Sequence, residues 1–256
     1  MKNIFLYLVL ISLQFEVGSS LLFSQTNEEL YEKGLKYRAE YNTKEAFPIF
    51  QKLLKSDSNN VNYLSNAAYF YAKAGYMQSI EEEKIKYYKT AEYLALKALK
   101  QDEKHADAHY AYALALGRLN ENVGSKQKIA NSKIIRSEAE RAIELDPKLG
   151  GAYHVLGRWH RTVAGFNVIE KGMINAFFGG VPTGASNEKA VEYFQKSIVY
   201  QPTYILNMYE LAATYHEMGK DIEAKVWLKK AMEIPITNDD NKSAREKCDA
   251  LLKKLE

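Results

Sequence analysis

Small and apolar residues recur three to four positions apart along most of the chain, the spacing that places them on one face of an α-helix. Five such stretches each end in polar residues or a helix stop: AFPIFQKLLKSDS (46–58), AEYLALKALKQDE (91–103), IRSEAERAIELDP (135–147), AVEYFQKSIVYQP (190–202) and AKVWLKKAMEIPI (224–236). The equivalent positions in the five stretches are Leu53, Ala98, Ala142, Ser197 and Ala231. Successive positions are 45, 44, 55 and 34 residues apart. Such a recurrence predicts a helical repeat protein.

A second set of helices precedes these five stretches. They read LYEKGLKY (30–37), LSNAAYFY (64–71), HYAYALAL (109–116), YHVLGRWH (153–160) and MYELAATY (208–215). Each has a small residue at one fixed place: Gly34, Ala68, Ala113, Gly157 and Ala212. A small side chain at that place lets two helices approach closely, so the two sets are expected to pair as antiparallel hairpins.

This pattern resembles the tetratricopeptide repeat (TPR) over residues 27–236, because the last separation equals the TPR period and the others exceed it by insertions. The resemblance implies an all-α superhelical array of about five helix hairpins with a concave groove. We therefore expect a repeat domain over residues 25–238. Residues 239–256 are expected to form a C-terminal capping helix, with Asn238 or Asp239 as its N-cap.

Three repeats contain insertions. Those within residues 75–90 and 117–134 are charged and polar, and are expected to lengthen the helices as solvated extensions. The insertion at 163–182 is apolar, with Phe166, Ile169, Met173, Ile174, Phe177 and Phe178. Its apolar band is wider than one packing stripe needs. Either it packs over the neighbouring repeats, or part of it lines a cavity or meets a membrane or an apolar ligand.

A narrower resemblance rests on IELDP, then LGRWHRTVAG, an apolar helix and FFGGVPTGASNEKAVEYFQKSIVYQP. These segments resemble the regulator of microtubule dynamics family of TPR proteins, best over roughly residues 90–215. The resemblance implies a helical-repeat interaction domain, associated in some members with microtubules or with lipid binding and organelle contacts. It implies no settled catalytic mechanism.

The N-terminal segment MKNIFLYLVLISLQFEVGSSLLFS (1–24) has a short positive start and an apolar run from Ile4 to Leu13. This pattern predicts a secretory signal peptide, and hence an exported protein that is periplasmic or secreted. Cleavage is expected after Ser20 or Ser24. The alternative is a retained membrane anchor over residues 4–23. The polar residues within that stretch argue against it, because polar groups inside a membrane are energetically costly.

The first helix of each hairpin is expected to face the concave side. The predicted groove-lining residues are Tyr31, Arg38, Asn62, Asn66, Tyr69, Lys73, Tyr110, Arg118, His154, Arg158, Arg161, Tyr209 and His216. Because arginine suits recognition of carboxylate or phosphate, the groove is predicted to hold an acidic peptide, a carboxylate terminus or an anionic head group. Alternatively, these cations pair within the chain with Glu32, Asp107, Glu210 and Glu217.

The sequence gives little support for nucleic-acid binding, catalysis or metal binding. The net charge of +3 and the lack of a long basic run give no reason to expect nucleic-acid binding. No catalytic, phosphate-binding or metal-binding motif appears, so we expect no enzyme, no cofactor and no metal. Cys248, the only cysteine, is predicted to be a buried core residue, and His160 is predicted to be a packed, hydrogen-bonded core histidine. Two functions remain: a scaffold for a protein partner with acidic features, and a binder or carrier of a lipid or other anionic amphipath.

Overall fold

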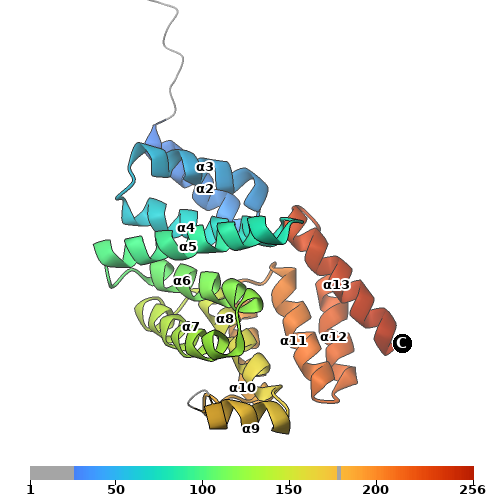
Figure 1. The fold of residues 1–256 in the computed structure, drawn as a ribbon. Coiled ribbons are helices and arrows are strands. Elements are labelled where there is room, and N and C mark those ends of the chain that lie inside the picture. The colour runs from blue at the N-terminus through green and yellow to red at the C-terminus, as the bar shows by residue number, and fades with distance from the viewer. Residues whose placement is uncertain (1–25, 178–179) are drawn as a thin grey trace, which may run out of the picture.

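A computed structural model of the chain describes residues 26–177 and 180–256 (Figure 1). Within this part of the chain all regular structure is helical. Its elements are α2 (Asn27–Ala39), α3 (Thr43–Ser56), α4 (Val61–Tyr76), α5 (Glu81–Gln101), α6 (Ala106–Leu119), η1 (Asn120–Asn122), α7 (Ser125–Leu145), α8 (Gly150–Ala164), α9 (Val168–Phe177), α10 (Asn187–Tyr200), α11 (Ile205–Glu217), α12 (Asp221–Glu233) and α13 (Asp239–Leu255).

The helices pair as α2–α3, α4–α5, α6–α7, α8–α10 and α11–α12, in agreement with the predicted hairpins. The polar insertions lengthen α5 and α7, which have 21 residues each. The apolar insertion forms α9 between the two helices of the fourth hairpin. The predicted signal segment, residues 1–24, lies outside the described residues.

Side chains cap several of these helices where the sequence indicates a start. Asn60 accepts from two backbone amides of α4, and Ser186 accepts from the Lys189 amide at 3.2 Å at the start of α10. Asn238 caps α13, accepting from the Asn241 amide at 2.8 Å. Each cap satisfies a backbone donor that has no partner within its helix, which helps to fix where the helix begins.

The small residues permit the close packing predicted for them. A Cβ atom added at Gly157 would lie 2.6 Å from the Phe194 ring of α10. One added at Gly34 would lie 2.8 Å from the Phe50 ring of α3. The hairpins therefore depend on glycine where an aromatic ring of the second helix lies against the first.

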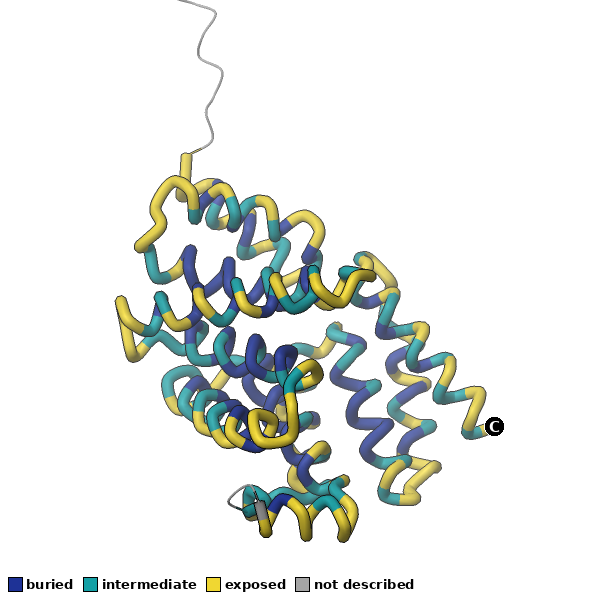
Figure 2. Tube along the Cα trace, viewed as in Figure 1, coloured by how far each residue is buried: buried dark blue, intermediate teal, exposed yellow. Residues whose placement is uncertain are grey.

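Two large groups of buried apolar residues stabilise the array (Figure 2). One spans α2 to α8, and the other joins α11, α12 and α13. The predicted core residue Cys248 is fully buried in the second group, and burial raises the pKa of its thiol to about 12. Phe194 of α10 and Leu211 of α11 pack together and connect the C-terminal hairpin to the rest.

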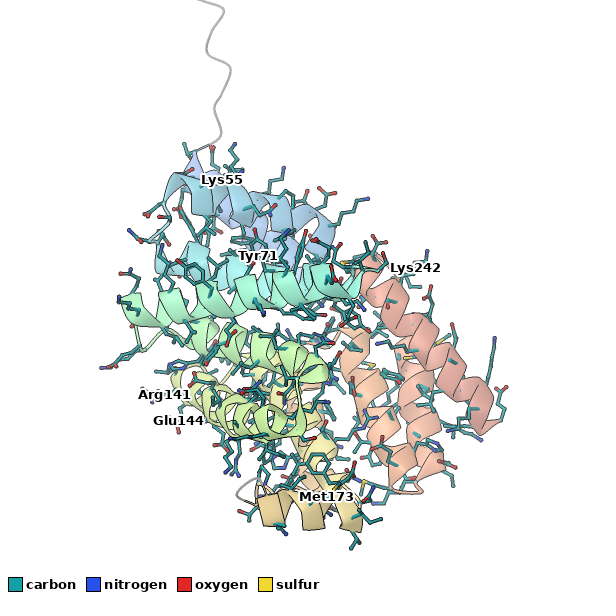
Figure 3. The ribbon with its side chains drawn as sticks, viewed as in Figure 1. Lys55, Tyr71, Arg141, Glu144, Met173 and Lys242 are labelled. Carbon is teal, nitrogen blue, oxygen red and sulfur yellow. The ribbon has the colours of Figure 1, made fainter. Side chains whose placement is uncertain are left out.

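The apolar side chains of α9 are more exposed than expected for an insertion that packs over the neighbouring repeats. Among the α9 side chains that the structure describes, only Ile174 is buried, whereas Val168, Ile169 and Met173 are 85%, 75% and 51% exposed. Figure 3 shows Met173 on α9 at the edge of the molecule. The expectation that the wide apolar face of this helix packs on the neighbouring repeats is therefore wrong for the described side chains, because only Ile174 among them is buried. No helix in the described ranges is long and apolar enough to cross a membrane.

Candidate binding sites on the concave face

The thirteen predicted lining residues all lie on α2, α4, α6, α8 and α11, the first helices of the five hairpins. Four of these helices contact one another in sequence: α4 with α6, α6 with α8, and α8 with α11. The predicted cations therefore lie on neighbouring helices, and a common lining of a groove stays a prediction. Their surroundings differ from helix to helix.

Arg38 lies in an acidic and aromatic environment. Its guanidinium donates to both carboxylate oxygens of Asp107, one at 3.0 Å, and to Asn66 Oδ1 at 2.7 Å. The guanidinium also lies 4.9 Å from the centre of the Tyr69 ring. Burial alone would raise the pKa of Asp107, but the adjacent Arg38 outweighs it and holds that pKa below its usual value. Asp107 thus satisfies Arg38 in a bidentate pair.

Lys73 holds a carboxylate from the far end of the chain. Its Nζ atom lies 2.7 Å from Asp240 Oδ2 of α13 and donates to the Tyr204 hydroxyl at 2.7 Å. The Thr43 hydroxyl also donates to Asp240, at 3.1 Å. The ring of Tyr41 stacks on that of Tyr204 with 4.6 Å between centres. The C-terminal helix therefore contacts the first two repeats through Asp240, and the connection before α11 contacts them through Tyr204.

Arg161 is the most completely paired cation of the groove. It lies 2.5 Å from Glu210 and 2.7 Å from Glu217, both on α11. Arg158 is held more loosely, at 3.8 Å from Glu210 and 3.9 Å from Glu121. Pairing within the chain, the alternative drawn from the sequence, thus occurs with three of its four named acids: Asp107, Glu210 and Glu217.

His154 is buried beside these pairs, and its Nδ1 atom lies 2.7 Å from Asn207 Oδ1. Burial is the main cause that lowers its pKa to about 4. The imidazole is consequently neutral at pH 7, and Nδ1 donates to the amide oxygen.

Arg118 has a different environment. Arg118 is buried, with 7% of its surface exposed, yet no carboxylate in the described part of the chain lies within 4 Å of its guanidinium. The guanidinium lies 4.3 Å from the centre of the Tyr76 ring, and its Nε has no hydrogen-bond partner among the described residues. Lys247 of α13 donates to the Tyr76 hydroxyl at 2.6 Å. A buried cation without an anion is energetically unfavourable.

A cavity of about 310 Å³ lies beside Arg118, between α6, α7 and α8. Its lining is mostly apolar, with three cations and a few other polar groups. The residues that line it are Ala113, Leu114, Gly117, Arg118, Asn120, Glu121, Lys128, Ile129, Ser132, Ile135, His154, Val155, Arg158, Trp159, Thr162, Val163 and Phe166. Trp159 is anchored through Nε1, which donates to Ser132 O at 2.8 Å.

The remaining predicted lining residues contact other side chains of the same chain. Asn62 Oδ1 lies 3.0 Å from His105 Nε2, and Tyr31 packs against the Phe50 and Tyr63 rings. The Tyr110 ring lies 5.7 Å from that of Tyr69. The Tyr209 ring lies 5.8 Å from Lys247 Nζ, and His216 lies 2.7 Å from Asp221. A ligand role for these residues stays a prediction.

The apolar insertion is divided between two settings. Phe166 lines the cavity together with Val163, at the end of α8. Ile174 is buried, and Ile169 and Met173 are exposed. The side chains of Phe177 and Phe178 lie outside the described part of the structure.

Sequence reasoning missed several important residues. Tyr204 lies in a connection between hairpins, and Asp240 lies on a helix that the sequence indicated only as a cap. Ile129 and Ser132 lie in the polar insertion that was expected to be solvated, but they are buried at the cavity. Their spacing to Ile135 is the one signal that could have indicated a buried face on this extension.

No group of three or more potential metal ligands occurs among the residues that the structure describes. His160 is 2% exposed, as predicted, and stacks on Tyr193 with 5.1 Å between ring centres. Its Nδ1 has no hydrogen-bond partner within the described ranges, whereas a hydrogen bond was expected. Burial lowers its pKa to about 4, so this histidine is a neutral packing residue.

Comparison with known proteins identifies the relatives of this chain. The family described as Regulator of microtubule dynamics protein 1-3 matches residues 25–256. The chain belongs to the regulator of microtubule dynamics family. The resemblance drawn from residues 90–215 is thereby confirmed over a longer range.

Two relatives show the extent of the likeness. Regulator of microtubule dynamics protein 1 of Bos taurus is 34% identical over 176 residues, which are 68% of this chain and 55% of that protein. Regulator of microtubule dynamics protein 3 of Rattus norvegicus is 29% identical over 223 residues, which are 86% of this chain and 46% of that protein. The chain spans about half the length of the curated relatives it matches.

Among solved structures, a thermophilic TPR protein of Thermus thermophilus is similar, with a TM-score of 0.61 over 89% of this chain and 100% of that chain. At 15% sequence identity the likeness shows the fold alone. The predicted all-α TPR-like array is thereby confirmed.

The predicted location is wrong. The relatives of this family member are regulators of microtubule dynamics from mammals, and microtubules are polymers of the cell interior. An exported protein, periplasmic or secreted, does not agree with this family. An apolar N-terminal run by itself was too weak a signal to support that prediction.

Proposed function

We propose that this protein binds an anionic amphipath in the cavity between α6, α7 and α8. The observation that carries the proposal is Arg118, a buried guanidinium beside an apolar cavity, with no carboxylate within 4 Å in the described part of the chain. An anion placed against Arg118 would compensate the unfavourable burial of its charge. An apolar chain attached to that anion would displace water from the rest of the cavity.

The lining of the cavity agrees with such a ligand. Its volume of about 310 Å³ lies at the lower end of the range for small-molecule sites. Leu114, Ile129 and Trp159 offer apolar surface, and Arg158 lines the cavity as a second cation. Arg158 is 39% exposed and only loosely paired, so it can turn to an incoming anion. The proposal assigns binding to these residues and no catalytic step.

A fluorescent long-chain carboxylic acid, added to the full chain without detergent, tests this proposal. Arg118→Met is expected to weaken binding at least tenfold, because it removes the buried cation and keeps the apolar volume. Arg136→Met is the matched control: Arg136 lies 5.1 Å from the Trp159 ring but does not line the cavity. Equal affinity of wild type and Arg118→Met would contradict the proposal, as would equal affinity for the alcohol of the same chain length.

A second candidate function is that of a scaffold that binds an acidic protein segment in the concave groove. It is favoured by the cations that four neighbouring helices bring to this face, and by the TPR fold. Among them, Arg158 is exposed and loosely paired, and is therefore the most available. The names of the relatives make microtubules the first partner to test.

Co-sedimentation with polymerised tubulin tests this second candidate. Arg158→Glu is expected to reduce the bound fraction severalfold, because it reverses a charge on the concave face. Lys86→Glu, at an exposed residue of the outer helix α5, is the matched control and should bind as wild type does. An unchanged bound fraction for Arg158→Glu would exclude a role of the groove in that binding.

A further inference from the structure

The first turn of α13 lies on the N-terminal repeats, although the apolar face of this helix packs elsewhere. Cys248 belongs to the core that α13 shares with α11 and α12. The contacts with the first two repeats are polar: the Asn238 side chain donates to Glu40 O at 2.7 Å, and the Thr43 hydroxyl donates to Asp240 at 3.1 Å. Loss of Asp240 alone would leave the buried Lys73 without an anion, but an incoming carboxylate that takes the place of Asp240 restores the pair. An acidic ligand can therefore displace the first turn while the C-terminal core stays intact.

Asp240 occupies the position that an acidic ligand of the groove would take. Its carboxylate lies 2.7 Å from Lys73 Nζ, and the two side chains are 6% and 11% exposed. Lys73 is one of the cations that the repeat pattern places on the concave face. The chain thus supplies an acidic group of its own to this cation.

The space around this pair carries an excess of positive charge. A cavity of about 360 Å³ is lined by three cations, Lys73, Arg118 and Lys247, and by two acids, Asp239 and Asp240. Neither Arg118 nor Lys247 has a carboxylate within 4 Å in the described ranges. When the two aspartates leave, the cavity retains cations alone. Its charge then suits a segment with at least two acidic residues.

We propose that Asp239 and Asp240 are an internal competitor for an acidic segment of a partner protein, which binds to Lys73 and Arg118 once the first turn of α13 is displaced. The inference rests on the second candidate function, and adds to it a defined subsite and its regulation. Because the competitor belongs to the same chain, its effective concentration at the site is high. The wild-type chain is therefore expected to bind acidic segments weakly.

Fluorescein-labelled hexaglutamate, titrated into the full chain, provides the test. Asp239→Asn with Asp240→Asn is expected to bind this peptide at least tenfold more tightly than wild type, because the internal carboxylates are removed. Adding Lys73→Met to that variant is expected to abolish the gain. Figure 3 shows Lys242 near the start of α13; its amide donates to Asn238 O at 3.1 Å. Hydrogen exchange of this amide should become faster when the peptide binds wild type.

The matched control is Glu81→Gln with Glu82→Gln, which makes the same charge change in the first turn of α5, on exposed residues. This control should bind the peptide as wild type does, and thermal unfolding followed by circular dichroism verifies that each variant is folded. Equal, measurable affinity of wild type and the double aspartate variant would overturn the competitor while groove binding stands. No binding by any variant would overturn groove binding itself, and the inference with it.

Discussion

Arg118 and Arg161 both lie near the ends of their helices, α6 and α8, yet they have opposite surroundings. Arg161 contacts two carboxylates of α11, Glu210 and Glu217. Arg118 contacts the Tyr76 ring and a mostly apolar cavity. Four of the first helices carry a cation near their ends, but the neighbouring helix decides whether that cation is neutralised within the chain. The unpaired member of the two therefore marks the better ligand site.

The paired region should be the more sensitive to loss of charge. Glu210→Gln is expected to lower the free energy of unfolding by about 2–3 kcal/mol, because it removes the buried carboxylate shared by Arg161 and Arg158, although Arg161 keeps Glu217. Urea denaturation measures this change. Glu217→Gln is the control, since Glu217 is 43% exposed and should cost less than about 1 kcal/mol. Similar small losses for both variants would remove the distinction between the two arginines.

The pH dependence of stability should report on the same region through His154. Burial lowers its folded-state pKa to about 4, from 6.5 for an ordinary histidine. Between pH 6.5 and 4, His154 takes up a proton in the unfolded chain but not in the folded chain, so stability falls as the pH falls. The loss should be about 2–3 kcal/mol, on the basis of about 1.4 kcal/mol per pKa unit.

Thermal or urea unfolding at several pH values measures this slope, and His154→Gln should reduce it to the part that comes from His160, whose pKa burial also lowers to about 4. A slope that persists unchanged in the variant would assign the effect to other groups. Glu210 does not interfere above pH 4.5, because Arg158 and Arg161 outweigh its burial and hold its pKa below that ordinary value.

The unpaired region should respond in the opposite way. Arg118→Met is expected to leave the free energy of unfolding within about 1 kcal/mol of wild type, because the loss of the contact with Tyr76 is offset by removal of an uncompensated buried charge. The same urea experiment measures it. A loss as large as that of Glu210→Gln would show that Arg118 is neutralised within the chain after all.

Helix α9 should give the smallest effect. Ile169→Ser with Met173→Ser is expected to change the midpoint of unfolding by little, within about 0.5 kcal/mol, since both side chains are mostly exposed. Ile174→Ser on the same helix is the contrasting variant, because Ile174 is buried. A large loss from the exposed pair would restore the interpretation of α9 as a packed cover.

The arrangement of hairpins could be predicted from local pattern. Helical periodicity, the small residues at Gly34 and Gly157, and the caps at Ser186 and Asn238 all act within one helix or one hairpin. The burial of Ile129 on α7 was missed, because a polar insertion gives only a weak apolar stripe. The exposure of most of α9 was missed because an apolar face does not show what covers it.

The sequence by itself determined the repeat and the family, because these follow from short-range spacing along the chain, and it predicted which residues lie on the first helix of each hairpin. Only the tertiary structure decided which of those residues are free. Asp240 reaches Lys73 from the other end of the chain, and Glu210 reaches Arg161 from the next hairpin. A charge is neutralised by whatever lies within a few ångströms of it, and in a superhelical array that neighbour is set by how distant repeats stack and close on each other.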